Sequence, residues 1–78
     1  MDNQIKQTVR EIIMKELGIK EISDETDLYS IGMESIKYIN IMVEIEAAFK
    51  IRIDDETVIE SNLRSVNQFS KFIEKLLN

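Results

Sequence analysis

The segment SIKYINIMVEIEAAFK, residues 35–50, decides the fold because it is the most apolar stretch of the chain. Read at 3.6 residues per turn, its apolar side chains fall into two stripes. One stripe comprises Tyr38, Ile41, Met42, Ile45 and Phe49, and the other comprises Ile36, Ile39, Val43 and Ala47. A helix that is apolar on two sides needs neighbours on both. The pattern therefore predicts a central helix with other elements packed around it, and it assigns Met42 to the core.

The segment before this helix predicts an amphipathic helix and a long loop. Over Asn3–Leu17 the apolar residues keep helical spacing, and they are Ile5, Val9, Ile12, Ile13 and Leu17. Asp2 or Asn3 would cap the start, and Gly18 suits the left-handed position after the end. Residues 19–34 lack this spacing, so we expect a loop that is pinned to the core by Ile22, Leu28, Tyr29 and Ile31. A loop of this length in a small domain is often functional.

The segment after the central helix predicts one short and one long helix. Asp54 or Asp55 would cap a helix that ends near Glu60. Its inward-facing residues are predicted to be Val58 and Ile59. Ser65 would then cap a last helix over Val66–Leu77. Its predicted buried face comprises Val66, Phe69, Ile73, Leu76 and Leu77, with Phe72 beside it. Three long helices and a short one predict an all-α four-helix bundle.

Length and composition narrow the possible functions. The 78 residues suit a single domain, residues 1–78, with a thin core. The chain has no cysteine and no histidine, which excludes disulfides, thiolate or imidazole metal sites, and histidine-dependent nucleophilic catalysis. No apolar run approaches the roughly 20 residues that span a bilayer, and the polar N-terminus lacks a signal region. We therefore expect a cytosolic protein, and we expect it to be a monomer.

The charge of the chain is acidic and unevenly distributed. The net charge of −5 comes from 15 acidic and 10 basic residues, which argues against nucleic acid as a partner because binding phosphates needs a surplus of Lys and Arg. Two stretches hold acids and no base, residues 21–34 and 54–60. They can be read as solvated loops or as a docking surface for basic enzymes, and charge alone leaves both readings open.

Ser35 is notable for its position between the acidic loop and the central helix. Helix capping is the ordinary explanation of a serine there. A helix N-terminus also presents unpaired N–H groups and a positive dipole end, so a phosphate attached to Ser35 would lie in a favourable field. Gly32 would let the backbone turn and leave room for a bulky group. With no histidine and only Lys37 nearby, the chain has no group to activate this hydroxyl, so another enzyme would have to modify it.

The run DLYSIGMESI, residues 27–36, resembles the attachment motif of acyl and peptidyl carrier proteins. In that family an Asp-Leu or Asp-Phe pair lies upstream, and a glycine lies three residues before the modified serine, usually as Gly-x-Asp-Ser-Leu or Gly-x-Asp-Ser-Ile. Residues 38–51 look like the second helix of the family, which ends in Glu-x-x-Phe. Residues 53–56 and 63–66 are similar to the segments that lead into the third and last helices. The resemblance thus covers nearly the whole chain.

Two departures from the family pattern bear on the pathway. Glu34 stands where the family usually has Asp before the serine. Residues 35–50 have no net charge, because Glu44 and Glu46 balance Lys37 and Lys50. This segment is less acidic than in typical carriers of fatty-acid synthesis, and it looks more like carriers of nonribosomal peptide or specialised pathways.

The resemblance implies a stand-alone acyl carrier protein without catalysis of its own. A phosphopantetheinyl transferase would move the 4′-phosphopantetheine arm from coenzyme A to the Ser35 Oγ. The thiol of the arm would hold the cargo as a thioester, and tethering would raise the cargo concentration at each loading or processing enzyme. Residues around the serine and on the short helix would be recognised by these partners, namely Met33, Glu34, Ile36, Lys37, Asn40, Asp55 and Glu56.

Alternatives stay open within and outside this family. The cargo could be aminoacyl or peptidyl, including D-alanyl, in a nonribosomal-peptide-like or cell-wall pathway, rather than acyl as in fatty acid or polyketide biosynthesis. Outside the family, the chain would be an unmodified helical interaction domain in which Ser35 only caps a helix. A calcium-binding loop over residues 24–34 fails because the sixth position is not glycine. An enzyme is the least supported reading.

Overall fold

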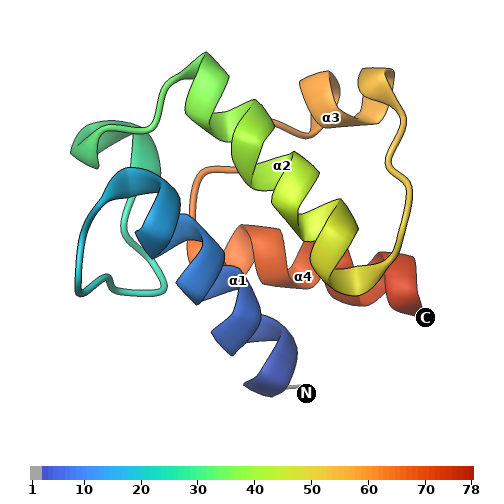
Figure 1. Ribbon diagram of the computed structural model, residues 1–78, viewed down its shortest axis with the longest axis horizontal. Helices are drawn as coiled ribbons and strands as arrows, with labels where there is room; N and C mark the ends of the chain where they lie inside the picture. The colour runs from blue at the N-terminus through green and yellow to red at the C-terminus, as the bar shows by residue number, and fades with distance from the viewer. Residues whose placement is uncertain (1–2) are drawn as a thin grey trace.

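A computed structural model describes residues 3–78, although not the side chain of Asn3, and these residues form four α-helices and one short 3₁₀ helix (Figure 1). The helices are α1 (Asn3–Leu17), η1 (Leu28–Ile31), α2 (Ser35–Phe49), α3 (Asp55–Ser61) and α4 (Val66–Leu77). Over this range there is no strand, so the predicted all-α fold with three long helices and one short helix is confirmed. The predicted cap of α1, Asp2 or Asn3, lies outside the side chains that are described.

One hydrophobic core runs through the bundle. α1 packs against both α2 and α4 (Figure 1), and Tyr38 of α2 also contacts Phe69 of α4. The completely buried side chains come from all three long helices and from η1, and they are Val9, Ile13, Leu28, Ile41, Ile45, Val66, Phe69 and Ile73. Met42 also lies in this core, as predicted. Burial of these apolar surfaces is the main favourable term in folding.

The ends of the helices follow from polar side chains in the sequence. The carboxylate of Asp54 accepts a hydrogen bond from the Thr57 N–H at 2.7 Å, which caps α3 and lowers the pKa of Asp54. The hydroxyl of Ser65 accepts from the Gln68 N–H at 3.2 Å and caps α4 as predicted. Gly18, after α1, has a φ of 70°. This is the left-handed conformation that ends helices and that glycine adopts without a steric penalty.

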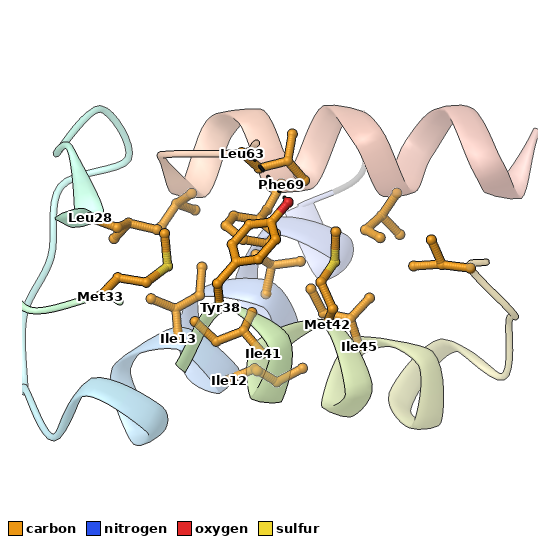
Figure 2. Close-up of a cluster of buried hydrophobic side chains, with 14 of the residues drawn as sticks. Ile12, Ile13, Leu28, Met33, Tyr38, Ile41, Met42, Ile45, Leu63 and Phe69 are labelled. Atoms are coloured by element: carbon orange, nitrogen blue, oxygen red, sulfur yellow. Dashed lines mark hydrogen bonds between the residues drawn. The ribbon is translucent and has the colours of Figure 1, made fainter. Parts of the chain in front are cut away.

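The hydroxyl of Tyr38 lies in the core beside Leu63 (Figure 2) and links α3 to the rest of the bundle. It donates a hydrogen bond to the Val58 carbonyl at 3.0 Å and accepts one from the Leu63 N–H at 3.3 Å. The Tyr38 ring also packs on Phe69, with the ring centres 5.8 Å apart. Burial raises the pKa of the Tyr38 hydroxyl, which therefore stays protonated and able to donate. Because α3 has no fully buried residue, this bridge is its strongest polar link to α2.

The second apolar stripe of α2 is largely exposed, contrary to the prediction. Ile36, Ile39 and Val43 are 68%, 50% and 56% exposed. Four other side chains predicted to face inward are also exposed in part or in full: Ile31, Ile59, Leu76 and Leu77. Spacing shows which residues share a face of a helix, but it does not show whether another element covers that face. Here α1 lies on one side of α2 only, and α3 is too short to cover the other side.

Replacing Tyr38 by phenylalanine tests the bridge. The Tyr38→Phe variant keeps the ring and its packing but leaves the Val58 carbonyl and the Leu63 N–H without their partner. We expect a loss of about 1–2 kcal/mol in the free energy of unfolding, measured by chemical denaturation. Tyr29→Phe is the matched control, since no hydrogen bond of the Tyr29 hydroxyl is found in the described residues. Equal losses in the two variants would show that the bridge contributes nothing specific.

Candidate functional site: the start of α2

Ser35 is the first residue of α2, and its side chain is exposed. Glu34 occupies the N-cap position, with an extended backbone and no capping hydrogen bond from its side chain. Within residues 3–78 the Ser35 hydroxyl has no hydrogen-bond partner. The interpretation of Ser35 as a helix cap is therefore wrong. Its side chain is exposed to solvent instead.

The first turn of α2 offers a favourable environment for a phosphate. The first hydrogen bond that closes the helix runs from the Tyr38 N–H to the Glu34 carbonyl at 2.8 Å. The N–H groups of the three preceding residues have no carbonyl one turn earlier to bond. Because Glu34 does not cap them, their partial positive charge is directed at the solvent around Ser35. Lys37 adds a full positive charge in the same turn.

The chain reaches Ser35 through a tight turn after η1. Gly32 has a φ of 117°, and both its N–H and that of Met33 donate to the Leu28 carbonyl. A Cβ on Gly32 would meet no atom within 4 Å, so the left-handed conformation, rather than space, favours glycine here. Leu28 is completely buried, and Met33 is 3% exposed and lies beside it at one end of the core (Figure 2). The two side chains anchor the backbone just before Ser35.

The burial of Met33 corrects its assignment to a partner surface. Its side chain follows a left-handed glycine that turns it into the core, where a partner cannot reach it. The other predicted recognition residues are not buried, and they lie in two groups: Glu34, Ile36, Lys37 and Asn40 on the first turns of α2, and Asp55 and Glu56 on the first turn of α3. The Asn40 amide donates to the Glu16 carboxylate at 2.9 Å, so it also links α2 to α1.

A groove between α2 and α3 lies next to this site, and most of its apolar lining was predicted from the sequence to face inward. Its lining includes Ile39 and Val43 from α2 and Asp55, Val58 and Ile59 from α3. The available signal was the second apolar stripe of α2 in a chain with few elements to cover it. The start of α2 and the groove together form one surface that carries Ser35, exposed apolar side chains and acids.

The structure separates the acids that stabilise the fold from those that face solvent. In the first acidic stretch, Asp24 pairs with Lys6 at 3.4 Å and with Arg10, and Asp27 pairs with Arg64 at 2.9 Å. Five acids of the two stretches have no ion pair and no side-chain hydrogen bond within the described residues: Glu21, Glu34, Asp55, Glu56 and Glu60. A docking surface for basic enzymes would therefore involve the acids of α3 and Glu34 more than the other acids of the loop.

The ion pairs of Asp24 predict a loss of stability in acid. A hydrogen bond from Arg10, together with the charges of Arg10 and Lys6, holds the pKa of Asp24 below its usual 3.8. This contribution is complete above pH 3.8 and disappears as the pH falls through the lower pKa of the folded state. We expect Asp24→Asn to remove part of the acid-induced loss of unfolding free energy, measured by denaturation from pH 7 to pH 2. Glu21→Gln is the control and should behave like the wild type; if Asp24→Asn does so as well, the pairs are unimportant.

Comparisons with known proteins identify the family of the chain. Residues 7–73 match the family described as phosphopantetheine attachment site. An acyl carrier protein of Akkermansia muciniphila is 31% identical over 78 residues, covering 96% of this chain and 95% of that protein. An aminoacyl carrier protein of Agrobacterium fabrum is 29% identical over 75 residues, covering 91% of this chain and 90% of that protein.

A solved structure shares the fold. It is a type-II acyl carrier protein of Streptomyces verticillus involved in bleomycin biosynthesis, and it matches with a TM-score of 0.82 over 96% of this chain and 88% of that chain. At 19% identity this likeness shows the fold alone. Together with the family match, the fold defines the chain as a phosphopantetheine-carrying domain. It belongs to the acyl carrier protein family.

Family membership confirms the predicted cofactor and carrier function. The cofactor of this family is covalently attached 4′-phosphopantetheine, and the exposed hydroxyl at the start of α2 suits it because the surrounding N–H groups and Lys37 favour a phosphate. An unmodified interaction domain is not supported. None of the helices described has both the length and the apolar character that crossing a membrane requires.

Proposed function

We propose that Ser35 is the attachment residue and that the chain carries acyl intermediates as thioesters on its arm. A comparison of the six serines supports this assignment. Four hydroxyls are engaged in hydrogen bonds with the backbone, those of Ser23, Ser30, Ser61 and Ser65. Ser70 is buried. Ser35 alone combines exposure with a hydroxyl that bonds to no described residue, and it alone follows a glycine by three positions.

The chemistry of attachment requires a second protein. The Ser35 Oγ would attack the phosphorus of coenzyme A that bears the pantetheine, forming an Oγ–P bond and releasing adenosine 3′,5′-bisphosphate. The proton of the hydroxyl must go to a base, and the chain has no histidine or cysteine to accept it. A phosphopantetheinyl transferase would therefore provide the base. Once attached, the thiol of the arm holds the cargo, and the chain itself catalyses no step.

Partner enzymes would bind the surface around Ser35. Its centre is apolar, with Ile36, Ile39 and Val43, and its edge on α3 is acidic, with Asp55 and Glu56. An apolar patch of this kind on a small protein marks an interaction site. The acids would speed the encounter with basic enzymes and select among them. We further propose that the chain is a cytosolic monomer of one domain that binds each enzyme weakly, since a carrier must dissociate to reach the next one.

Mass measurement tests the attachment residue. Incubation with coenzyme A and a promiscuous phosphopantetheinyl transferase should add one phosphopantetheine to the wild-type chain, and Ser35→Ala should abolish the addition because the acceptor oxygen is gone. Ser30→Ala, in the same loop, is the control and should be modified normally. Modification of the Ser35→Ala variant, or none of the wild type, would refute the assignment.

The cargo has a second candidate, an amino acid. Two observations favour it: one relative is an aminoacyl carrier protein, and residues 35–50 have no net charge. Intact-mass measurement of the loaded protein, isolated from cells that also express its neighbouring genes, separates the two. The mass added to the arm should correspond to an acyl group under our proposal, and to an aminoacyl group under the alternative.

Matched surface variants test the docking surface. Ile39→Ser removes an exposed apolar side chain beside the groove, and we expect the kcat/KM of phosphopantetheine transfer to fall about fivefold to tenfold, as for a residue near the centre of an interface. Leu76→Ser is the control, because Leu76 is similarly exposed near the end of α4, and Figure 1 shows that end far from the start of α2. If both variants react at the same rate, the docking surface lies elsewhere.

A further inference from the structure

The connection between α3 and α4 holds the loop before Ser35, although the two are far apart in the sequence. The Leu28 N–H donates to the Arg64 carbonyl at 2.7 Å, and the Asn67 N–H donates to the Asp24 carbonyl at 3.1 Å. A side-chain hydrogen bond joins the Asn67 amide to the Glu25 carboxylate as well. The loop is thus attached to the start of α4 by backbone and side-chain bonds.

The side chain of Arg64 also contacts the loop. Its guanidinium donates to Asp27 Oδ2 at 2.9 Å and lies 4.6 Å from the centre of the Tyr29 ring, over its face. The other oxygen of Asp27 accepts from the Tyr29 N–H and caps η1. Arg64 thus contacts the residue that caps η1, Asp27, and one residue within η1, Tyr29. The hydrogen bond from Arg64 lowers the pKa of Asp27, so the pair stays charged at neutral pH.

The contact reaches Ser35 through the backbone. η1 ends in the turn where the Gly32 and Met33 N–H groups both donate to the Leu28 carbonyl. The Leu28 N–H is in turn held by the Arg64 carbonyl. Ser35 makes no side-chain hydrogen bond of its own in the described structure, so the backbone on its two sides sets its position. On one side this is α2, and on the other it is the turn fixed by η1.

We propose that Arg64 is a positioning residue for modification of Ser35. By holding Asp27 and Tyr29, its side chain keeps η1 folded, and the folded η1 keeps the turn before Ser35 in one conformation. The transferase then meets the hydroxyl in a defined place, and it does not have to select one from many loop conformations. This inference rests on the proposed attachment at Ser35.

Variants of Arg64 test this role by two independent measurements. We expect Arg64→Ala to raise amide hydrogen exchange at Gly32 and Met33 about threefold to tenfold, since an exposed ion pair and a cation–π contact are lost together. The kcat/KM of transfer should fall in parallel. Arg64→Lys should give values between those of the wild type and Arg64→Ala in both measurements. Lysine keeps the charge but cannot form the planar stack on Tyr29.

A core variant separates positioning from general destabilisation. Ile73→Val removes one buried methyl group from α4 and should cost about 1 kcal/mol of stability, but Ile73 makes no hydrogen bond to the loop. It should leave the kcat/KM of transfer unchanged.

Two outcomes would overturn the proposal. In the first, Arg64→Ala exchanges like the wild type at Met33. In the second, its kcat/KM of transfer falls without faster exchange, which would make Arg64 a direct contact of the transferase. If the wild type is not modified at all, the attachment proposal fails, while the exchange measurement still decides the role of Arg64 in the loop.

Discussion

The hydrogen bonds of one buried hydroxyl, that of Tyr38, hold together α2, α3 and the segment before α4. They join α2 to the Val58 carbonyl in α3 and to the Leu63 N–H just before α4. α3 depends on them because it has no fully buried residue and cannot be held by burial alone. Since Tyr38 lies one turn after Ser35, the same bonds hold the acidic helix α3 beside the start of α2.

The exposed stripe of α2 follows from the size of the chain. A domain of 78 residues buries a smaller fraction of its surface than a large one, and here the three long helices already use their apolar faces on a single core. α3 partly covers α2 through Val58 and leaves Ile39 and Val43 exposed beside the groove. Under our proposal that several enzymes bind the chain in turn, an uncovered apolar face next to Ser35 would give each of them the same place to dock.

Much of the fold was predictable because it depends on local pattern. The boundaries of α1 and α4 match the prediction, since both combine helical spacing with a clear signal at one end, Gly18 or Ser65. The burial of Met33 was not predictable in this way, because the turn at Gly32 sends its side chain inward. The exposure of Ile59 was not predictable either, because it depends on how much of α2 the short helix α3 covers. The pair of Asp27 and Arg64 joins residues 37 positions apart, and no local pattern indicates it.

The acids show why charge counted along the sequence overstates the docking surface. In the loop, Asp24 and Asp27 are bound to cations of the chain itself, so a partner meets little of their charge. On α3, Asp55 and Glu56 lie in the first turn, where the helix dipole favours negative charge. They therefore stabilise α3 and face solvent at the same time. Exposed charges act mainly on the rate of encounter. Under the proposed docking, the difference in affinity between one partner and another would therefore come chiefly from the exposed apolar residues of α2.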